Sequence, residues 1–311
     1  MRRRHSSPPE PPQVLALFGP TASGKSAVAE AIADEIPAEV VSADSMQVYR
    51  GLPILTNQAE APAHLVGIWD LDHEASVAEY ARLAHATIDA ILARGRTPVV
   101  AGGTGLYFRA ALADLGVPPA PVPGARDHWG RVYDRLGAGA AHAALAERDP
   151  AAAAALHPHD RRRVVRALEL ADAGSSLSPA SARLWTDDTR HPTLVVGLDV
   201  PRDQLLLLID ARTRAMLAAG AADEARAALG APLSATAEKV IGLHEAAELP
   251  GEEAFAAITL RTRQYAAYQR KWMRRIPGLV TVRGDRPPRE IAREILELAG
   301  RRQPLSARRA G

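Results

Sequence analysis

The chain contains no cysteine, which excludes disulfide bonds, a thiol nucleophile and cysteine–zinc sites. Aromatic residues make up only 4% of its 311 residues, and lysine occurs only at Lys25, Lys239 and Lys271. No apolar run approaches the roughly 20 residues that a bilayer-spanning helix needs, and no apolar stretch follows the basic start as in a secretory signal. The net charge of +2 gives no global attraction to nucleic acid, so the local distribution of charge must decide. We therefore expect a soluble globular protein, cytoplasmic and monomeric.

The most specific feature that is present is a phosphate-loop motif. A strand-like run, residues 14–18, leads into Gly19, Pro20, Thr21, Ala22, Ser23, Gly24, Lys25 and Ser26, and an alanine-rich helical stretch follows. In this setting backbone N–H groups surround a phosphate, and the positive end of the helix dipole attracts it. Lys25 adds a point charge to the phosphate oxygens, and the Ser26 hydroxyl is placed to ligate Mg²⁺. The motif predicts binding of a di- or triphosphate.

Strand-like and helical patterns alternate along much of the chain. The predicted strands cover 14–18, 39–42, 97–101, 193–198 and 279–282. The predicted helices cover 25–35, 76–94, 201–219, 221–229, 252–276 and 288–299. Such alternation indicates an α/β fold of the P-loop NTPase type, a parallel sheet covered by helices with ligands at the carboxyl ends of the strands. The phosphate loop, Asp44 and the turn 102–105 follow such ends and should share one site.

A change in composition predicts the domain organisation. Residues 117–124 are rich in proline, and 125–185 look wholly helical. The predicted parts are a disordered tail, 1–12; a discontinuous catalytic core, 13–119 and 191–300; a helical insertion, 120–190; and a basic tail, 301–311.

Asp44 is the second candidate for chemistry. A carboxylate at a strand end beside a phosphate loop serves as a Mg²⁺ ligand or as a base, and it also caps helices, here one over 45–50. The block 41–50 lacks the four apolar residues that precede the acid of a nucleotide hydrolase. The polar groups of Ser45 and Gln47 instead resemble a pocket that reads the edge of a base.

Three blocks together resemble the tRNA dimethylallyltransferase family: the phosphate loop 19–26 and the runs 42–51 and 101–108. Later family motifs are matched by 157–160, 163–169, 241–242 and 262–266. The resemblance covers about residues 14–275 in the family's order. The combination of the first three blocks is highly specific, whereas each block alone is not.

The resemblance implies a reaction and a role for each matching residue. In that family the phosphate loop holds dimethylallyl diphosphate with Mg²⁺, and no ATP is hydrolysed. The N6 amine of the adenosine adjacent to the anticodon attacks the allylic carbon, and diphosphate leaves. Asp44 matches the aspartate that receives the amine proton, and Thr21, Lys25 and Ser26 match diphosphate and metal contacts. Arg212 matches the arginine that steadies the leaving group; a surface helical arginine is the alternative.

The predicted contacts with tRNA come from the resemblance and from local charge. They are Asp44, Ser45, Met46, Gln47, Gly103, Thr104, Arg161, Arg162, Arg163, Arg166 and Arg263. The arginines would contact phosphates and make the affinity salt-dependent, although a solvated arginine face is the alternative. The stripe Tyr265, Tyr268, Trp272 has helical spacing and favours core packing over base stacking. His157 and His159 lack a third ligand at zinc spacing, so we do not expect zinc.

Departures from the family pattern leave competing functions open. They are Leu55, Gln58, His244, Ala267, Tyr268 and Lys271, and they concern the expected tRNA-facing surfaces more than the diphosphate site. The main prediction is a prenyltransferase that uses Mg²⁺, dimethylallyl diphosphate and the anticodon stem-loop of tRNA. The alternatives are an adenylate prenyltransferase that acts on a free nucleotide, a phosphate-loop kinase and a non-catalytic RNA-binding relative. The arginine-bearing insertion favours a polynucleotide, because a free nucleotide does not require it.

Overall fold

The computed structural model describes residues 13–58, 61–116, 122, 124–177 and 184–301. The predicted tails, 1–12 and nearly all of 301–311, lie outside these residues, and so does most of the proline-rich stretch. The chain divides into two compact units, which we call the core unit (Met1–Ala113 with Asp187–Gly311) and the helical unit (Asp114–Thr186). No described helix has the length and apolar character needed to cross a membrane.

The core unit is built on a six-stranded, wholly parallel sheet with the strand order β3-β2-β4-β1-β5-β6. Its strands are β1 (Val14–Phe18), β2 (Ala38–Ser42), β3 (Ala63–His64), β4 (Thr97–Gly102), β5 (Thr193–Asp199) and β6 (Val280–Arg283). β1 lies between β4 and β5, with Phe18 opposite both Gly102 and Gly197. The segments that follow β1, β2 and β4 therefore leave the same edge of the sheet.

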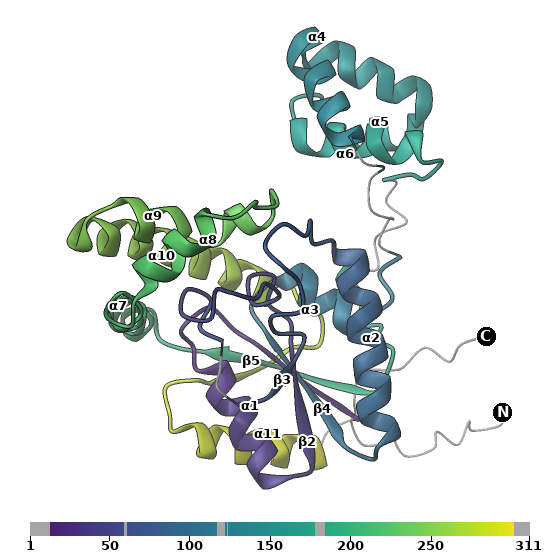
Figure 1. Cartoon of the computed structure of the whole chain (residues 1–311). Helices are drawn as coiled ribbons and strands as arrows, with labels where there is room; N and C mark the ends of the chain where they lie inside the picture. Colours follow the sequence, from purple (N-terminus) through teal and green to yellow (C-terminus); the bar gives the residue numbers. More distant parts are fainter. Residues whose placement is uncertain (1–12, 59–60, 117–121, 123, 178–183, 302–311) are drawn as a thin grey trace, which may run out of the picture. The chain divides into compact units, whose positions relative to one another are not determined.

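Helices cover both faces of this sheet (Figure 1). The core unit contains α1 (Lys25–Glu35), α2 (Val77–Ala93), α3 (Gly105–Leu112), α7 (Arg202–Ala218), α8 (Ala221–Leu229), the 3₁₀ turn η2 (Ala237–Lys239), α9 (Leu243–Glu248), α10 (Gly251–Met273) and α11 (Pro288–Arg301). Along β1, Leu15 and Leu17 pack in one cluster with α1 and α11. Val14, Ala16 and Phe18 pack in the other, with α2 and α3. This alternation follows from the two-residue period of a strand, which is buried here on both faces.

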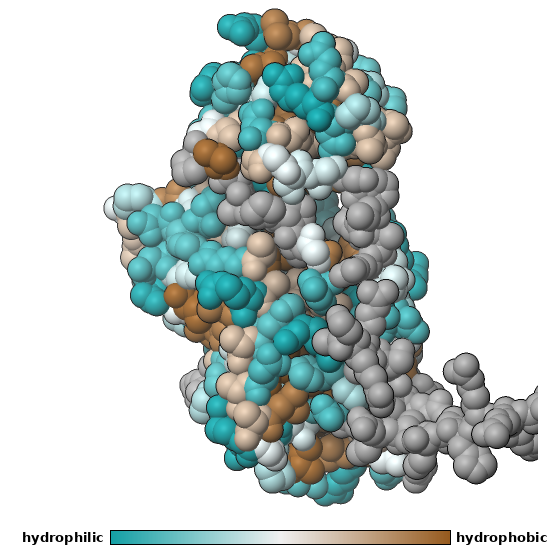
Figure 2. Space-filling model, turned by 90° about the vertical axis from the view of Figure 1, so that its right-hand side faces the viewer, coloured by the Kyte–Doolittle hydropathy of each residue, from teal (hydrophilic) through white to brown (hydrophobic). Residues whose placement is uncertain are grey.

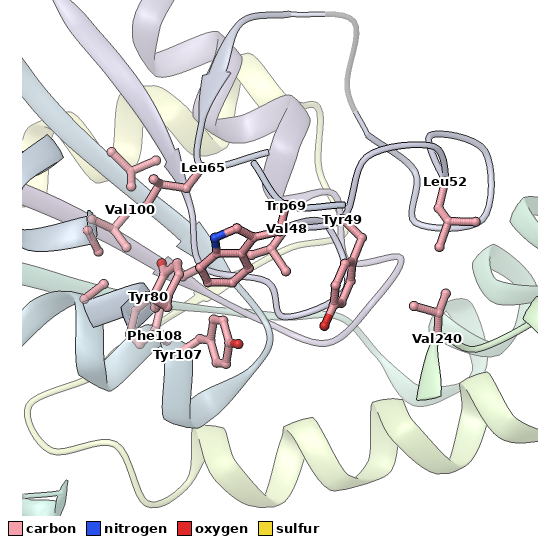
Figure 3. Packing of buried hydrophobic residues seen from close by; sticks show 14 of the residues in the cluster. Val48, Tyr49, Leu52, Leu65, Trp69, Tyr80, Val100, Tyr107, Phe108 and Val240 are labelled. Atoms are coloured by element: carbon pink, nitrogen blue, oxygen red, sulfur yellow. The ribbon is translucent and has the colours of Figure 1, made fainter. Parts of the chain in front are cut away.

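The predicted strands and long helices agree with the structure to within a few residues, whereas β3, α3 and α9 were not predicted. All residues of α3 except Leu106 are buried, so the helix lacks the polar face that reveals an amphipathic helix. Its side chains Tyr107 and Phe108 gather with Trp69 and Tyr80 in the aromatic part of the core (Figure 3). The surface seen in Figure 2 is mainly hydrophilic, with scattered hydrophobic residues.

The helical unit consists of α4 (Ala125–Arg148), α5 (Pro150–Ala155) and α6 (Arg161–Asp172) around its own apolar cluster. α5 begins because Pro150 occupies its first turn and Asp149 Oδ1 accepts a hydrogen bond from Ala152 N–H at 3.0 Å. The prediction that 125–185 is wholly helical is wrong after Asp172. Residues 173–177 contain no helix, and a left-handed glycine at 174 (φ 67°) follows α6.

Candidate active site

The ends of β1, β2 and β4 meet at one cavity of about 1040 Å³ in the core unit. Its polar part is lined by the phosphate loop, Asp44, Gln47 and Arg212. Its apolar part is lined by Ile54, Leu55, Leu208, Met216, Ile241 and Ile258. One cavity thus joins a place for a phosphate group with a place for a hydrocarbon group.

Most of the predicted phosphate loop faces this cavity. Thr21, Ala22, Gly24, Lys25 and Ser26 line it, whereas Gly19, Pro20 and the buried Ser23 lie behind them. The loop curls tightly because Gly24 has a left-handed backbone (φ 80°), which glycine adopts without a steric penalty. α1 begins at the next residue, so its positive dipole end points at the cavity.

Lys25 is the half-buried cation of the phosphate loop. Its Nζ donates a hydrogen bond to Pro20 O at 2.7 Å. Burial lowers the pKa of Lys25 to about 8; the charge of Asp44 opposes this shift, and that of Arg212 adds to it. An ammonium group held away from water in this way is poised to gain an anionic partner.

Arg212 reaches the same loop from α7. Its Nη1 donates to Thr21 Oγ1 at 2.8 Å, and burial lowers its pKa while Asp44 opposes that shift. The alternative of a solvated surface arginine is therefore wrong. Thr21 N–H donates to Gln269 Oε1 of α10 at 2.7 Å, which fixes the loop from the opposite side.

Asp44 lies between these cations and the end of β2. Its Oδ1 accepts a hydrogen bond from Met46 N–H at 2.9 Å, which leaves Oδ2 for the cavity. Residues 45–48 form turns and not a helix, so the helix-cap alternative for Asp44 is wrong. The carboxylate instead closes a local turn of its own, a common arrangement of aspartate.

The turn after β4 packs tightly against its neighbours. A Cβ on Gly102 would lie 2.2 Å from Ala43 O, and one on Gly103 would lie 2.2 Å from Gln269 Nε2. Thr104 Oγ1 accepts a hydrogen bond from Ser45 N–H at 3.2 Å and lies 3.1 Å from the Tyr265 hydroxyl. Of the three hydroxyl groups that Ser45, Thr104 and Tyr265 bring together, only that of Tyr265 belongs to a residue that lines the cavity; the predicted contacts Ser45, Gly103 and Thr104 lie behind it. Burial raises the pKa of Tyr265, so that it stays protonated.

We predicted that Gln47 reads the edge of a base, but most of its hydrogen-bonding groups are bound within the protein. Its Oε1 accepts from Ser42 Oγ at 2.8 Å, and its Nε2 donates to Thr56 O at 3.2 Å and to Asn57 O at 3.0 Å. Both amide protons are therefore occupied, and only an acceptor lone pair is left for a base. Met46 also lines the cavity.

The predicted arginine patch of the helical unit is largely neutralised. Arg161 pairs with Asp134 at 2.6 Å, and Arg166 pairs with the buried Glu169 at 2.9 Å. Arg163 lies 3.9 Å from Asp160. Among the residues that the structure describes, Arg162 has no ion pair. In the core unit, Arg263 donates to both oxygens of Asp210 at 2.7 Å.

The aromatic stripe of α10 is not a uniform core face. Tyr268 is 54% exposed, so core packing is wrong for this residue. Tyr265 lines the cavity. Trp272 is partly buried and packs against the core, with its indole ring beside Gly105. Sequence spacing placed the three side chains on one helix face, but it could not show where the neighbouring elements end.

The prediction missed Gln269, Glu224 and the site position of Tyr265. Gln269 holds the phosphate loop across 248 residues of sequence, and Glu224 binds the loop 53–58 from α8. No local motif marks either residue. Only the burial of Gln269, which is 1% exposed, distinguishes this polar side chain, and burial is not visible in the sequence.

Known proteins resemble this chain over most of its length. The family model described as IPP transferase matches residues 47–276, and the model described as isopentenyl transferase matches 12–66. A tRNA dimethylallyltransferase from Streptomyces coelicolor is 41% identical, with 97% of this chain and 100% of the relative covered. One from Anaeromyxobacter sp. strain K is 42% identical over 92% of this chain and 97% of its own.

Solved structures also match this chain. The full-length tRNA isopentenylpyrophosphate transferase of Bacillus halodurans matches with a TM-score of 0.64 and 31% identity, covering 93% of this chain and 96% of its own. A eukaryotic dimethylallyltransferase, crystallised acting on tRNA, matches with a TM-score of 0.69 and 26% identity over 86% of this chain and 73% of its own.

Proposed function

The chain belongs to the IPP transferase family of tRNA dimethylallyltransferases, and we propose that it transfers a dimethylallyl group from dimethylallyl diphosphate to the N6 amine of the adenosine adjacent to the anticodon of tRNA. The observation that carries the proposal is the cavity that joins Asp44, Lys25 and Arg212 with an apolar wall. A hydrocarbon attached to a diphosphate matches both parts of this cavity.

The phosphate loop and Arg212 hold the diphosphate. Lys25 and Arg212 supply positive charge, the start of α1 supplies N–H groups, and the Thr21 hydroxyl, which accepts from Arg212, keeps its own proton for a diphosphate oxygen. Negative charge grows on the departing oxygen as the carbon–oxygen bond breaks. Preorganised, partly buried cations therefore lower the barrier more than they strengthen substrate binding.

Asp44 takes the proton of the attacking amine. The N6 lone pair forms the new bond to the allylic carbon, the carbon–oxygen bond breaks, and its electron pair leaves with the diphosphate. The amine proton passes to Asp44 Oδ2, because Oδ1 is bound to Met46 N–H. Ser45, Thr104 and Tyr265 provide hydroxyl groups that orient the adenine.

The donor atoms at this position fit Mg²⁺. The Ser26 hydroxyl lines the same cavity as Asp44, at the start of α1. Together with oxygen atoms of the diphosphate it would hold Mg²⁺, since this hard cation prefers oxygen ligands. When bound, Mg²⁺ neutralises part of the charge on the leaving group.

The test uses the full-length chain, Mg²⁺ and labelled dimethylallyl diphosphate, with tRNA, AMP or no acceptor. We expect the label in tRNA alone. Label in AMP and not in tRNA would mean an adenylate prenyltransferase, and label in neither would contradict prenyl transfer to an adenosine acceptor.

A further inference from the structure

The loop 53–58 forms one wall of the cavity, and residues outside the phosphate loop hold it in place. Its residues Pro53, Ile54, Leu55, Thr56, Asn57 and Gln58 all line the cavity. Asn57 has a left-handed backbone (φ 50°), so this segment has a defined and slightly strained shape. It belongs to neither a strand nor a helix, and its shape depends on the contacts that it makes.

Glu224 of α8 makes the main polar contact with this wall. Its Oε2 accepts a hydrogen bond from Ile54 N–H and its Oε1 accepts one from Leu55 N–H, each at 2.8 Å. Two successive N–H groups that point at one carboxylate form an anion-binding concavity, which the side chain fills. Hydrogen bonds to an ionised acceptor are about twice as strong as neutral ones.

Apolar contacts also hold the loop 53–58 against the core. Leu55 is 5% exposed, and its side chain lies beside Gly242, where an added Cβ would come within 3.0 Å of Leu55 Cδ2. Leu52, just before the loop, points toward Val240 in the core (Figure 3). Glu224 therefore sets the backbone of a wall whose side chains already pack against the start of α9.

The far end of the loop leads to the candidate base. The carbonyl oxygens of Thr56 and Asn57 accept both amide protons of Gln47, and Gln47 Oε1 accepts the hydroxyl proton of Ser42. Ser42 ends β2, two residues before Asp44. The loop thus links Glu224 to the acceptor side of the site, and among the described residues no hydrogen bond or ion pair joins the loop to Lys25 or Arg212.

We propose that Glu224 is a positioning residue: it holds the wall 53–58, and through Gln47 it sets the acceptor side of the cavity for the adenosine of tRNA. This inference rests on the proposed function. Glu224→Gln keeps the shape of the side chain but replaces one of the two accepting oxygens by an NH2 group, which would face a backbone N–H that it cannot accept. Asp223→Asn is the matched control. It removes the same charge from the same turn of α8, and Asp223 is exposed and pairs only with Arg226 among the described residues.

The experiment measures two properties of the full-length protein. The first is hydrogen exchange of the peptide that covers 52–58, which we expect to be faster in Glu224→Gln and unchanged in Asp223→Asn. The second is kinetics with each substrate varied in turn. We expect kcat/KM for tRNA to fall roughly tenfold, as for loss of a charged hydrogen bond, with the affinity for inorganic diphosphate, which reports on the phosphate part of the cavity, changed less than twofold.

The outcomes separate positioning from stability alone. A variant that is merely less folded loses kcat without a change in the KM for tRNA, and that result would overturn the proposal; so would parent-like exchange at 52–58. If Glu224→Gln does not fold, Glu224→Asp takes its place, since it keeps the charge but is too short to reach both N–H groups. We expect of it the same faster exchange at 52–58 and the same lower kcat/KM for tRNA. If the parent transfers nothing to tRNA, the proposed function and the kinetic part of this inference fall together, while the exchange measurement still decides whether Glu224 holds the wall.

Discussion

Replacing Asp44 by asparagine tests the proposed transfer of a proton from the attacking amine to Asp44. Asp44 Oδ1 accepts the Met46 N–H at 2.9 Å, so asparagine will keep its carbonyl oxygen at this position and turn its amide nitrogen toward the cavity. An amide nitrogen cannot take a proton, and it presents N–H groups to an amine that must lose one. General-base catalysis contributes about 10²–10⁴-fold, and we expect single-turnover prenyl transfer to fall by that factor.

The same substitution should leave donor binding intact. Asp44 is the negative charge that faces Lys25 and Arg212 and raises the pKa of both. Its loss makes the cavity more positive, so the affinity for a diphosphate should stay the same or increase at neutral pH. A weakened affinity for diphosphate would contradict this arrangement of charges.

The assay is single-turnover transfer to tRNA over a series of Mg²⁺ concentrations. If Asp44 is the base, the rate of the variant remains low at every concentration. If Asp44 is chiefly a metal ligand, excess Mg²⁺ restores much of the rate, and this result would refute the assignment of the base. The affinity for tRNA, measured in parallel, must remain close to that of the parent for the comparison to hold.

The remaining predictions address the phosphate loop, the arginines and the packing of the site. Lys25→Ala should lower transfer about 10²–10³-fold and leave tRNA binding intact; a rate near that of the parent would exclude the phosphate-loop assignment. Because the pKa of Lys25 is lowered to about 8, its protonated fraction falls about fivefold from pH 8 to pH 9, and donor affinity should fall with it in the parent but not in Lys25→Arg. Arg162→Gln should reduce the slope of log affinity for tRNA against log salt by roughly 0.7–0.9, whereas an unchanged slope would make Arg162 a solvated group. Gly102→Ala should lower the melting temperature, since its Cβ would lie 2.2 Å from Ala43 O; an unchanged melting temperature would contradict that contact.

The fold and the site could be predicted from the sequence where a feature depends on a short segment of the chain. The phosphate loop is recognisable because one short segment contains the strand, the glycines and the start of the helix. The parallel sheet is recognisable because buried strands and amphipathic helices alternate, and parallel strands place their carboxyl ends at one edge. Asp44 could be assigned to the site from that rule alone.

Contacts between distant segments were not predictable in the same way. Arg263 looks like a free cation in its helix, but its partner Asp210 lies 53 residues away on α7. Gln269 resembles any polar helical residue until the fold brings it to Thr21. Glu224 looks like one of two equivalent acids at the start of α8, and only the path of the loop 53–58 distinguishes it from Asp223.

A phosphate loop alone does not decide which bond of a diphosphate ester is broken. In this chain the decision lies in what surrounds the loop. Lys25 and Arg212 are both desolvated, and burial lowers the pKa of each, so each gains most from a partner whose negative charge increases. A leaving diphosphate is such a partner, because it gains charge as the carbon–oxygen bond breaks. Asp44 stands beside the same cations at the end of β2, where an amine that becomes positive can lose its proton. In the proposed reaction opposite charges would develop at the two ends of the reacting group, and the site offers a fixed group of the complementary sign for each of them.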